Sequence, residues 1–409
     1  MDRTIRIQLH PKPEQAEALK ETLSQFTRAF NHVVAYGWEH KERNGVKLHH
    51  ATYRETKASC PGLVSDLLIQ ARVKATETVK SALTWQKKQE ADYPKRVAKA
   101  QKKGKPVPVF KPVKCPHVKV CPIRYNLHTY KLNWDTHHVN IASTQGRLFI
   151  PFTVPPYSAK YVGYPVATAD LCYRNGKFWL HVVVSVPEPS IPPTATVMGV
   201  DLGLNRPAVT SQRQFFGKRH WKEVDRRYFR LRRKLQSNGS KSAKRHLKKL
   251  SKKLARFHRD CDHVLSRRII QQAPPGSTLV LENLTNIRDT SKLGRGKQNK
   301  NVANKRRLHS WSFAQLYNFI AYKAQERSIA VVKIDPRHTS QTCSRCGSQH
   351  RSNRRSQSLF LCRQCGYCLN ADLNAAQNIR EKHLASLASV GISFAGGLSS
   401  SSLSSQSSD

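Results

Sequence analysis

Four cysteines toward the carboxyl end form the pattern that most restricts what this chain can fold into. They make two CxxC pairs separated by 15 residues, namely Cys343 with Cys346 and Cys362 with Cys365. A glycine after each pair, Gly347 or Gly366, allows the tight turn that points two thiolates at one metal. Four thiolates at this spacing are typical of a structural, tetrahedral Zn²⁺ site. The alternative is a pair of redox-active or disulfide-bonded cysteines.

The distribution of the ten cysteines also favours metal binding in a reducing compartment. Five of them lie between Cys343 and Cys368, which is unlike the spread of a disulfide framework. Cys368 follows the second pair closely, but we leave it out of the predicted ligand set. The amino terminus lacks an apolar signal core, and no run of 18 apolar residues occurs. We therefore expect a cytoplasmic protein with no membrane partner.

The charge of the chain predicts a polyanionic partner. It has 409 residues, with 71 Lys and Arg against 26 Asp and Glu, and a formal net charge of +45. Such an excess repels itself unless an anion neutralises it. Hydrophobic residues at 38% and aromatic residues at 8% are enough for packed cores, which excludes a wholly disordered basic protein. The length suggests two to four domains.

The first half of the chain reads as a helical segment enclosed by β structure. Alternating apolar residues predict a strand over 4–9 and short antiparallel strands, barrel-like in arrangement, over 125–186. Apolar positions at helical spacing predict helices over 13–40 and 63–88. Residues 86–124 are basic and rich in proline without clear periodicity, and they predict a loop system.

The second half alternates strands with helices, which favours an α/β domain. One very basic stretch, 218–260, predicts a single long helix with an apolar seam. The last 24 residues are rich in serine and predict a disordered tail. The other predicted elements are a buried strand over 198–209 with a hairpin partner ending near Phe216, strands over 278–282 and 329–334, a loop over 288–309, and helices over 311–327 and 371–386.

Three carboxylates stand out because each lies in an apolar context within a strongly basic chain. Asp201 ends one predicted strand, Glu282 ends another, and Asp372 begins the last helix. Neighbouring strand ends and a helix start can converge on one sheet edge, where hard oxygen ligands suit two Mg²⁺ or Mn²⁺ ions and phosphodiester hydrolysis. Taken singly, Asp372 is equally explained as a helix N-cap and Asp201 as a turn residue.

The sequence around these acids resembles the three RuvC motifs of the TnpB family of transposon-encoded, RNA-guided nucleases, which are ancestral to type V CRISPR effectors. The first motif is matched by Gly199-Val-Asp-Leu-Gly-Leu204, the second by Leu281-Glu-Asn-Leu284, and the third by Asn370-Ala-Asp-Leu-Asn-Ala-Ala376. Residues 336–343 lead into the cysteine cluster between the second and third motifs. The strong resemblance covers about residues 196–382, and residues 4–40 resemble the family's amino terminus more weakly.

The resemblance implies a multidomain α+β fold: an RNase H-like (RuvC) α/β nuclease domain with an inserted four-cysteine zinc ribbon, and an amino-terminal wedge β-barrel with a helical recognition insertion. The implied divisions are 1–10 (first barrel strand), 11–90 (helical recognition domain), 91–124 (basic loop), 125–190 (wedge barrel), 196–335 (first nuclease segment), 336–368 (zinc ribbon), 369–386 (second nuclease segment) and 387–409 (disordered tail).

The resemblance also implies an activity and its requirements. The protein would be an RNA-guided, Mg²⁺-dependent endonuclease, encoded by a transposable element, that cuts double-stranded DNA beside a transposon-adjacent motif. Asp201, Glu282 and Asp372 would be its catalytic, magnesium-binding residues, and Cys343, Cys346, Cys362 and Cys365 would hold structural Zn²⁺. Its partners would be a guide RNA from the element's own transcript and the target DNA, in a prokaryotic cytoplasm at the nucleoid; no protein partner or oligomeric state is inferred.

Two alternatives stay open. One is a transposase that joins DNA strands, because that chemistry also uses three carboxylates on an RNase H-type fold. The other is a nuclease-inactive, RNA-guided DNA-binding repressor. The retention of all three acids weighs against the repressor.

Overall fold

A computed structural model describes residues 1–389 apart from 103, 188, 191–195, 286, 288–307 and 309. The chain divides into two compact units, an N-terminal unit (Met1–Pro187) and a C-terminal unit (Glu188–Asp409), and each is described by itself. The predicted loop over 288–309, except Leu308, and the serine-rich tail from 390 onward lie outside the described residues. Across the described ranges, no helix is both long enough and apolar enough to span a membrane.

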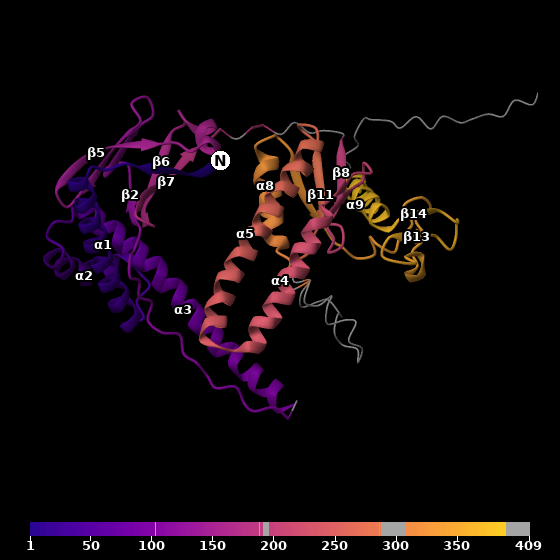
Figure 1. Cartoon of the computed structure of the whole chain (residues 1–409), viewed down its shortest axis with the longest axis horizontal. Helices are drawn as coiled ribbons and strands as arrows, with labels where there is room; N and C mark the ends of the chain where they lie inside the picture. Colours follow the sequence, from indigo (N-terminus) through magenta and orange to yellow (C-terminus); the bar gives the residue numbers. More distant parts are fainter. Residues whose placement is uncertain are drawn as a thin grey trace, which may run out of the picture. The chain divides into compact units, whose positions relative to one another are not determined.

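The N-terminal unit contains a seven-stranded antiparallel sheet that curls into a near-closed barrel (Figure 1). Its strands are β1 (Asp2–Leu9), β2 (Ile123–Tyr125), β3 (Tyr130–Asn133), β4 (His138–Ser143), β5 (Gly146–Thr153), β6 (Val166–Arg174) and β7 (Lys177–Ser185), in the order β2-β6-β7-β1-β5-β4-β3. The Tyr125 hydroxyl on β2 donates to the Ala142 carbonyl on β4, and the Tyr130 hydroxyl on β3 donates to the Ala167 carbonyl on β6. These bonds bring the two ends of the strand order together, and the predicted β-barrel is confirmed.

Three helices pack beside this barrel: α1 (Pro13–Glu39), α2 (Gly45–Ser59) and α3 (Ser65–Gln101). The sequence pattern did not predict α2, because its buried residues are Leu48, Thr52 and Thr56, and two threonines give no apolar periodicity. The prediction that 91–124 is entirely loop is wrong, because α3 continues to Gln101. Most of that end of α3 is solvent-exposed, and the alanine, lysine, arginine and glutamine residues that follow Pro94 favour helix without an apolar stripe.

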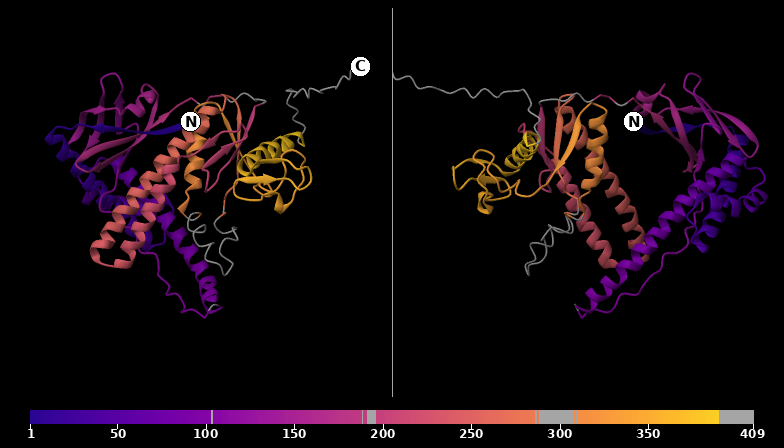
Figure 2. Two further views of the ribbon diagram at one scale, coloured as in Figure 1. Left: turned by 45° about the vertical axis from the view of Figure 1, so that its right-hand side comes forward. Right: turned by 180° about the vertical axis from the view of Figure 1, so that it is seen from behind.

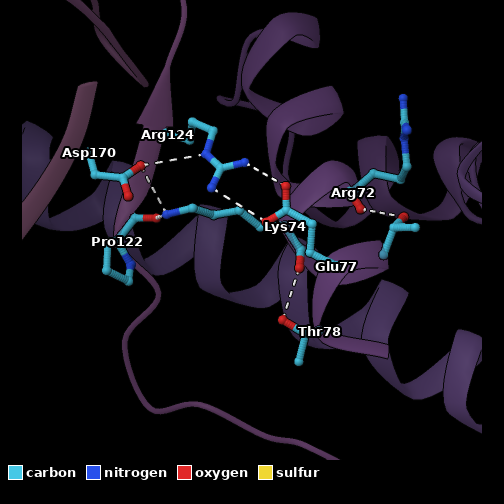
Figure 3. Close-up of polar contacts among 8 residues, drawn as sticks. Arg72, Lys74, Glu77, Thr78, Pro122, Arg124 and Asp170 are labelled. Atoms are coloured by element: carbon cyan, nitrogen blue, oxygen red, sulfur yellow. Dashed lines mark hydrogen bonds and ion pairs between the residues drawn. The ribbon is translucent and has the colours of Figure 1, made fainter. Parts of the chain in front are cut away.

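Figure 3 shows how α3 is fixed to the barrel by charged side chains. Lys74 Nζ lies 3.1 Å from Asp170 Oδ1 on β6 and donates to the Pro122 carbonyl at 2.8 Å. Arg124 on β2 donates to Glu77 of α3, with Nη1 and Oε1 2.9 Å apart, and its Nε lies 3.7 Å from Asp170 Oδ1. Asp170 therefore joins one cation from the helix and one from the barrel, which orients the two layers.

The C-terminal unit is built on a five-stranded sheet with strand order β10-β9-β8-β11-β12. The strands are β8 (Val197–Asp201), β9 (Ala208–Thr210), β10 (Phe215–Phe216), β11 (Thr278–Glu282) and β12 (Ala330–Ile334). β8, β11 and β12 are parallel, whereas β9 runs antiparallel to β8. The prediction of one strand over 198–209 is wrong, because Gly203 and Pro207 lie in a turn that separates β8 from β9.

Helices cover both faces of this sheet (Figures 1 and 2). Met198 and Val200 of β8 pack with α5 (Lys241–Gln272) and α8 (Phe313–Gln325) on one face. Val197, which faces the opposite way, packs against Ile379 of α9 (Ala371–Ala388) on the other face. The predicted RNase H-like α/β fold is confirmed, and burial on both faces explains why β8 reads as continuously apolar.

The single basic helix predicted over 218–260 is two antiparallel helices, α4 (Arg219–Asn238) and α5. Gly239 ends α4 in the left-handed region, with φ of 65°. The Ser240 side chain then caps α5 by accepting a hydrogen bond from the Ala243 amide at 3.1 Å. A Gly-Ser pair of this kind ends one helix and starts the next. The break was not predicted because the sequence is equally basic on both sides of it.

Candidate metal and carboxylate site

The four predicted zinc ligands lie together in a small ribbon made by β13 (Leu359–Leu361) and β14 (Cys368–Asn370). The Sγ atoms of Cys343, Cys346, Cys362 and Cys365 all lie within 4.8 Å of one another. Two of the separations are 3.8 Å and 3.6 Å, close to the ~3.8 Å expected between thiolates bound tetrahedrally at ~2.3 Å. The cluster therefore has the dimensions of a structural Zn²⁺ site, and Cys368 is outside it.

The turns that close the cluster explain the glycine after each CxxC pair. Gly347 has φ of 76° and Gly366 has φ of 68°, a region that other residues rarely adopt. Each glycine amide donates back to the first cysteine of its pair, Gly347 to the Cys343 carbonyl at 3.0 Å and Gly366 to the Cys362 carbonyl at 3.1 Å. The two knuckles are thus shaped by the backbone.

We expect Cys362→Ser to lose bound zinc and to unfold the ribbon, because three thiolates leave the site open and a structural zinc supplies folding energy. Metal content per chain, measured by mass spectrometry on the purified protein, checks this. Cys368→Ser is the matched control, because Cys368 pairs with Leu361 in the ribbon without joining the cluster. Equal loss of zinc in both variants would contradict the assignment of ligands.

The three acids come together at one edge of the five-stranded sheet. Asp201 and Glu282 end the adjacent parallel strands β8 and β11, one residue beyond the paired Val200 and Leu281. Asp372 is the second residue of α9, which packs along β8. Among the described residues, the carboxylate oxygens of the three are not all within 4.8 Å of one another, so they are looser than the cysteine cluster.

The structure excludes two alternative explanations, a helix N-cap at Asp372 and a turn residue at Asp201. The N-cap of α9 is Asn370, whose side chain accepts from the amides of Asp372 and Leu373, so Asp372 is not the cap. Asp201 is the last residue of β8 and pairs with Val209 of β9, so it is a strand residue. Neither the cap nor the turn therefore accounts for these two side chains.

Two of the three acids, Asp201 and Glu282, have raised pKa values. Burial raises the pKa of Asp201 well above its usual value, and the charges of Glu282 and Asp372 raise it further. Burial also raises the pKa of Glu282, against a hydrogen bond from Thr339 and the charge of Lys382. Burial and the neighbouring carboxylates disfavour the ionised form of Asp201, and a bound cation would favour it. This donor set fits Mg²⁺ or Mn²⁺, which prefer oxygen ligands.

Two neighbours of these acids were not predicted as site residues. Arg354 of the ribbon donates from Nη2 to Asp372 Oδ1 at 2.9 Å, and the two side chains are 25% and 10% exposed. Thr339, in the segment before the first knuckle, donates from Oγ1 to Glu282 Oε1 at 2.6 Å. Arg354 is one of 71 Lys and Arg residues, and nothing in the sequence distinguishes it from the others, so only the folded ribbon reveals it.

A basic groove lies between α4 and α5. Its volume is about 890 Å³, and both apolar and cationic side chains line it. The lining residues are Arg227, Tyr228, Leu231, His246, Lys249, Leu250, Lys252, Lys253, Ala255 and Arg256. A surface that combines cations with an aromatic ring suits a nucleic acid backbone and its bases.

Comparison with protein families and structures assigns the class. Residues 181–288 match the OrfB_IS605 family, described as "Probable transposase", and residues 313–379 match the "Cas12f1-like, TNB domain" family. The solved structure of CasPhi-2 (Cas12j) bound to crRNA is similar to this chain with a TM-score of 0.54 at 12% sequence identity, covering 94% of this chain and 98% of that one. The fold is therefore that of the Cas12-like proteins.

The chain is similar in sequence to several nucleases and TnpB-like proteins. Over 135 residues, 32% of this chain and 29% of the relative, the chain is 42% identical to the CRISPR-associated endodeoxyribonuclease Cas12f1 of Sulfoacidibacillus thermotolerans. Over 260 residues, 59% of this chain and 63% of the relative, it is 30% identical to the putative RNA-guided DNA endonuclease InsQ of Escherichia coli. It is also 32% identical over 165 residues, 39% of this chain, to the TnpB-like protein MJ0751 of Methanocaldococcus jannaschii, spanning 56% of that relative. The chain thus spans less than two thirds of the length of each of these relatives. Two segments of the chain thus match the OrfB_IS605 and Cas12f1-like TNB family models, and its sequence relatives include TnpB-like proteins and Cas12f nucleases.

Proposed function

We propose that this protein is an RNA-guided endonuclease, encoded by a transposable element, that hydrolyses double-stranded DNA beside a transposon-adjacent motif. The observation that carries the proposal is the convergence of Asp201, Glu282 and Asp372 from β8, β11 and α9, where burial and then mutual repulsion raise the pKa of Asp201. Divalent cations held by these acids would supply an activated water and stabilise the charge that develops on the phosphate. InsQ, which is named a putative RNA-guided DNA endonuclease, supports the same activity.

The surrounding residues support this chemistry through charge and position. Arg354 balances part of the charge on Asp372 and holds the side chain in place. Lys382, on α9, adds positive charge near Glu282. The four-cysteine cluster would hold a structural Zn²⁺ that keeps Arg354 and its ribbon folded, and it has no open position for catalysis.

The proposed partners are a guide RNA from the element's own transcript and a target DNA. In an RNA-guided enzyme, base pairing reads the sequence, so the protein needs a positive surface for phosphates. The groove between α4 and α5 offers that surface. We assign the barrel strands (1–10 and 125–190) to a wedge domain, the helices within 11–90 to a recognition domain, and the sheet segments 196–335 and 369–386, with the ribbon 336–368, to the nuclease.

A second candidate function is strand transfer by a transposase. It is favoured by the description of the matching family as a probable transposase and by the same three acids. A repressor without nuclease activity is the less favoured alternative, because none of the three acids is replaced.

The test is guided cleavage by the protein co-expressed with the DNA that flanks its own gene and purified with the RNA it retains. We expect Mg²⁺-dependent cutting of plasmids that carry the guide-matched target, restricted to a subset of randomised flanks and absent in Asp201→Ala. Retained RNA and tight target binding without cutting would indicate the repressor. Joining of a marked element's ends that requires Glu282, without guided cutting, would indicate the transposase.

A further inference from the structure

A buried threonine contacts one of the three acids directly. Thr339 is 4% exposed, and its Oγ1 lies 2.6 Å from Glu282 Oε1 and 3.0 Å from the Pro336 carbonyl oxygen. A hydroxyl has one proton, and a carboxylate accepts it more strongly than a neutral carbonyl does. We propose that Thr339 is a positioning residue that holds Glu282 in its place at the sheet edge. This inference rests on the proposed role of Glu282 as a metal ligand.

Two buried amides fix the backbone that carries Thr339. Asn378 Nδ2 donates to the carbonyls of Thr339 and Thr342, at 2.7 Å in each case. Asn374 Nδ2 donates to the Thr342 carbonyl at 2.8 Å, and its Oδ1 accepts from the Ser344 amide at 3.0 Å. Asn374 is 0% and Asn378 is 8% exposed, so these bonds are protected from water. The segment around Thr339 is thereby held to α9 by buried hydrogen bonds.

Both amides stand one turn apart on α9, which is the helix that also carries Asp372. Glu282 comes from a different element, β11, so a separate contact is needed to set its side chain relative to α9. The Thr339 hydroxyl supplies that contact, because its own backbone is bonded to Asn378. The result is a chain of hydrogen bonds from α9 through Thr339 to Glu282.

The hydrogen bond from Thr339 to Glu282 also has an electrostatic effect. Glu282 and Asp201 repel each other across neighbouring strand ends, and a glutamate side chain can rotate away from such repulsion. A short hydrogen bond to Oε1 offsets part of that repulsion and restricts the side chain. When outer residues of this kind are removed from metal sites, metal affinity or activity falls by about 10–100-fold.

A merely structural Thr339 makes a different prediction. The same hydroxyl could close the local turn by donating to the Pro336 carbonyl, as threonine commonly does in turns. In that case its removal lowers stability without changing how the three acids respond to a divalent cation. The two roles are therefore separated by a measurement of cation binding.

The test compares Thr339→Val, Thr339→Ser and Thr342→Val in the full-length protein. Valine keeps the branched shape of threonine without the hydroxyl, and serine restores the hydroxyl. Thr342 is the matched control, because its Oγ1 donates to the His338 carbonyl in the same segment and touches none of the acids. Mn²⁺ binding is measured by electron paramagnetic resonance of the free ion, with Asp201→Ala defining the signal from the three acids. Melting curves confirm that each variant is folded.

We expect Thr339→Val to weaken Mn²⁺ binding by about 10-fold or more, with Thr339→Ser close to wild type and Thr342→Val unchanged. Wild-type affinity in folded Thr339→Val, or failure of serine to restore it, overturns the proposal. If Thr339→Val does not fold, Thr339→Ser and Thr339→Ala test the proposal instead. A folded alanine variant with wild-type Mn²⁺ affinity overturns the proposal. A serine variant that loses about 10-fold or more in Mn²⁺ affinity overturns it as well.

The outcome is separable from that of the proposed function. If the wild-type protein cuts no DNA but Thr339→Val weakens Mn²⁺ binding, the positioning role stands and the endonuclease assignment fails. If the wild-type protein cuts guided targets and Thr339→Val binds Mn²⁺ normally with an unchanged Mg²⁺ requirement for cleavage, the endonuclease stands and the positioning role fails.

Discussion

Asp201→Asn should abolish DNA cleavage and, in the same protein stripped of divalent cations, raise its melting temperature. The loss of cleavage follows because the amide is a poor ligand for Mg²⁺, and losing several kcal/mol of charge stabilisation slows the reaction by about 10³-fold or more. The gain in stability follows because the substitution removes the charge of Asp201, which burial and repulsion by Glu282 and Asp372 disfavour. Relief of about 1 kcal/mol corresponds to a rise of about 2–4 °C for a unit of this size.

The pH dependence of unfolding gives the sign of this effect. Because burial raises the pKa of Asp201, the folded protein holds this proton more tightly than the unfolded chain does. Its contribution to stability is therefore fully present below the unfolded pKa and is lost as pH rises through the folded pKa. At neutral pH without a cation, ionised Asp201 destabilises the fold, and asparagine removes that part of the pH dependence.

Thermal melts in a chelator, from acidic to neutral pH, measure the melting temperature and its pH dependence. Added Mg²⁺ should then stabilise the wild type but not the variant. Asp335→Asn is the matched control, because Asp335 is an exposed carboxylate that follows β12, the third parallel strand. It should leave cleavage and melting unchanged. A lower melting temperature for Asp201→Asn in the chelator would show that repulsion does not dominate this site.

Local patterns in the sequence carried the prediction of the strands and of the acids that end them. β8 and β11 are short apolar runs, each ended by a carboxylate, and parallel pairing then places Asp201 beside Glu282. The cysteine spacing likewise predicts a local knuckle, because each CxxC pair folds through its own glycine turn. Such features depend on neighbouring residues, so the sequence expresses them directly.

Features that depend on distant contacts were not predictable in the same way. Arg354 reaches Asp372 only because the ribbon folds back on α9, and no spacing rule selects one arginine in so basic a chain. The helix break at Gly239 is not evident in the sequence, because α4 and α5 on either side of it have the same basic composition. The end of α3 shows the converse, since an exposed helix needs no apolar stripe to form.

The close approach of α9 to the sheet depends on Gly199 in the middle of β8. A Cβ atom at this position would lie 2.2 Å from the Ala376 carbonyl oxygen and 2.7 Å from the Arg380 amide nitrogen. In an α-helix these two atoms, four residues apart, are partners in one backbone hydrogen bond. The backbone of α9 therefore rests against the bare Cα of Gly199, and neither atom belongs to a flexible side chain that can move aside.

Gly199→Ala should consequently push α9 away from β8, lowering stability by about 1–3 kcal/mol or more and reducing cleavage as well. Cleavage falls because α9 carries Asp372, whose position relative to Asp201 depends on this contact. Met198→Leu is the matched control: it changes the adjacent residue on the opposite face, keeps its volume and should cost less than about 1.5 kcal/mol. Denaturant unfolding and Mg²⁺-dependent cleavage measure the two effects. If Gly199→Ala unfolds and cuts as the wild type does, α9 cannot lie this close to the strand, and the convergence of Asp372 with Asp201 needs another explanation.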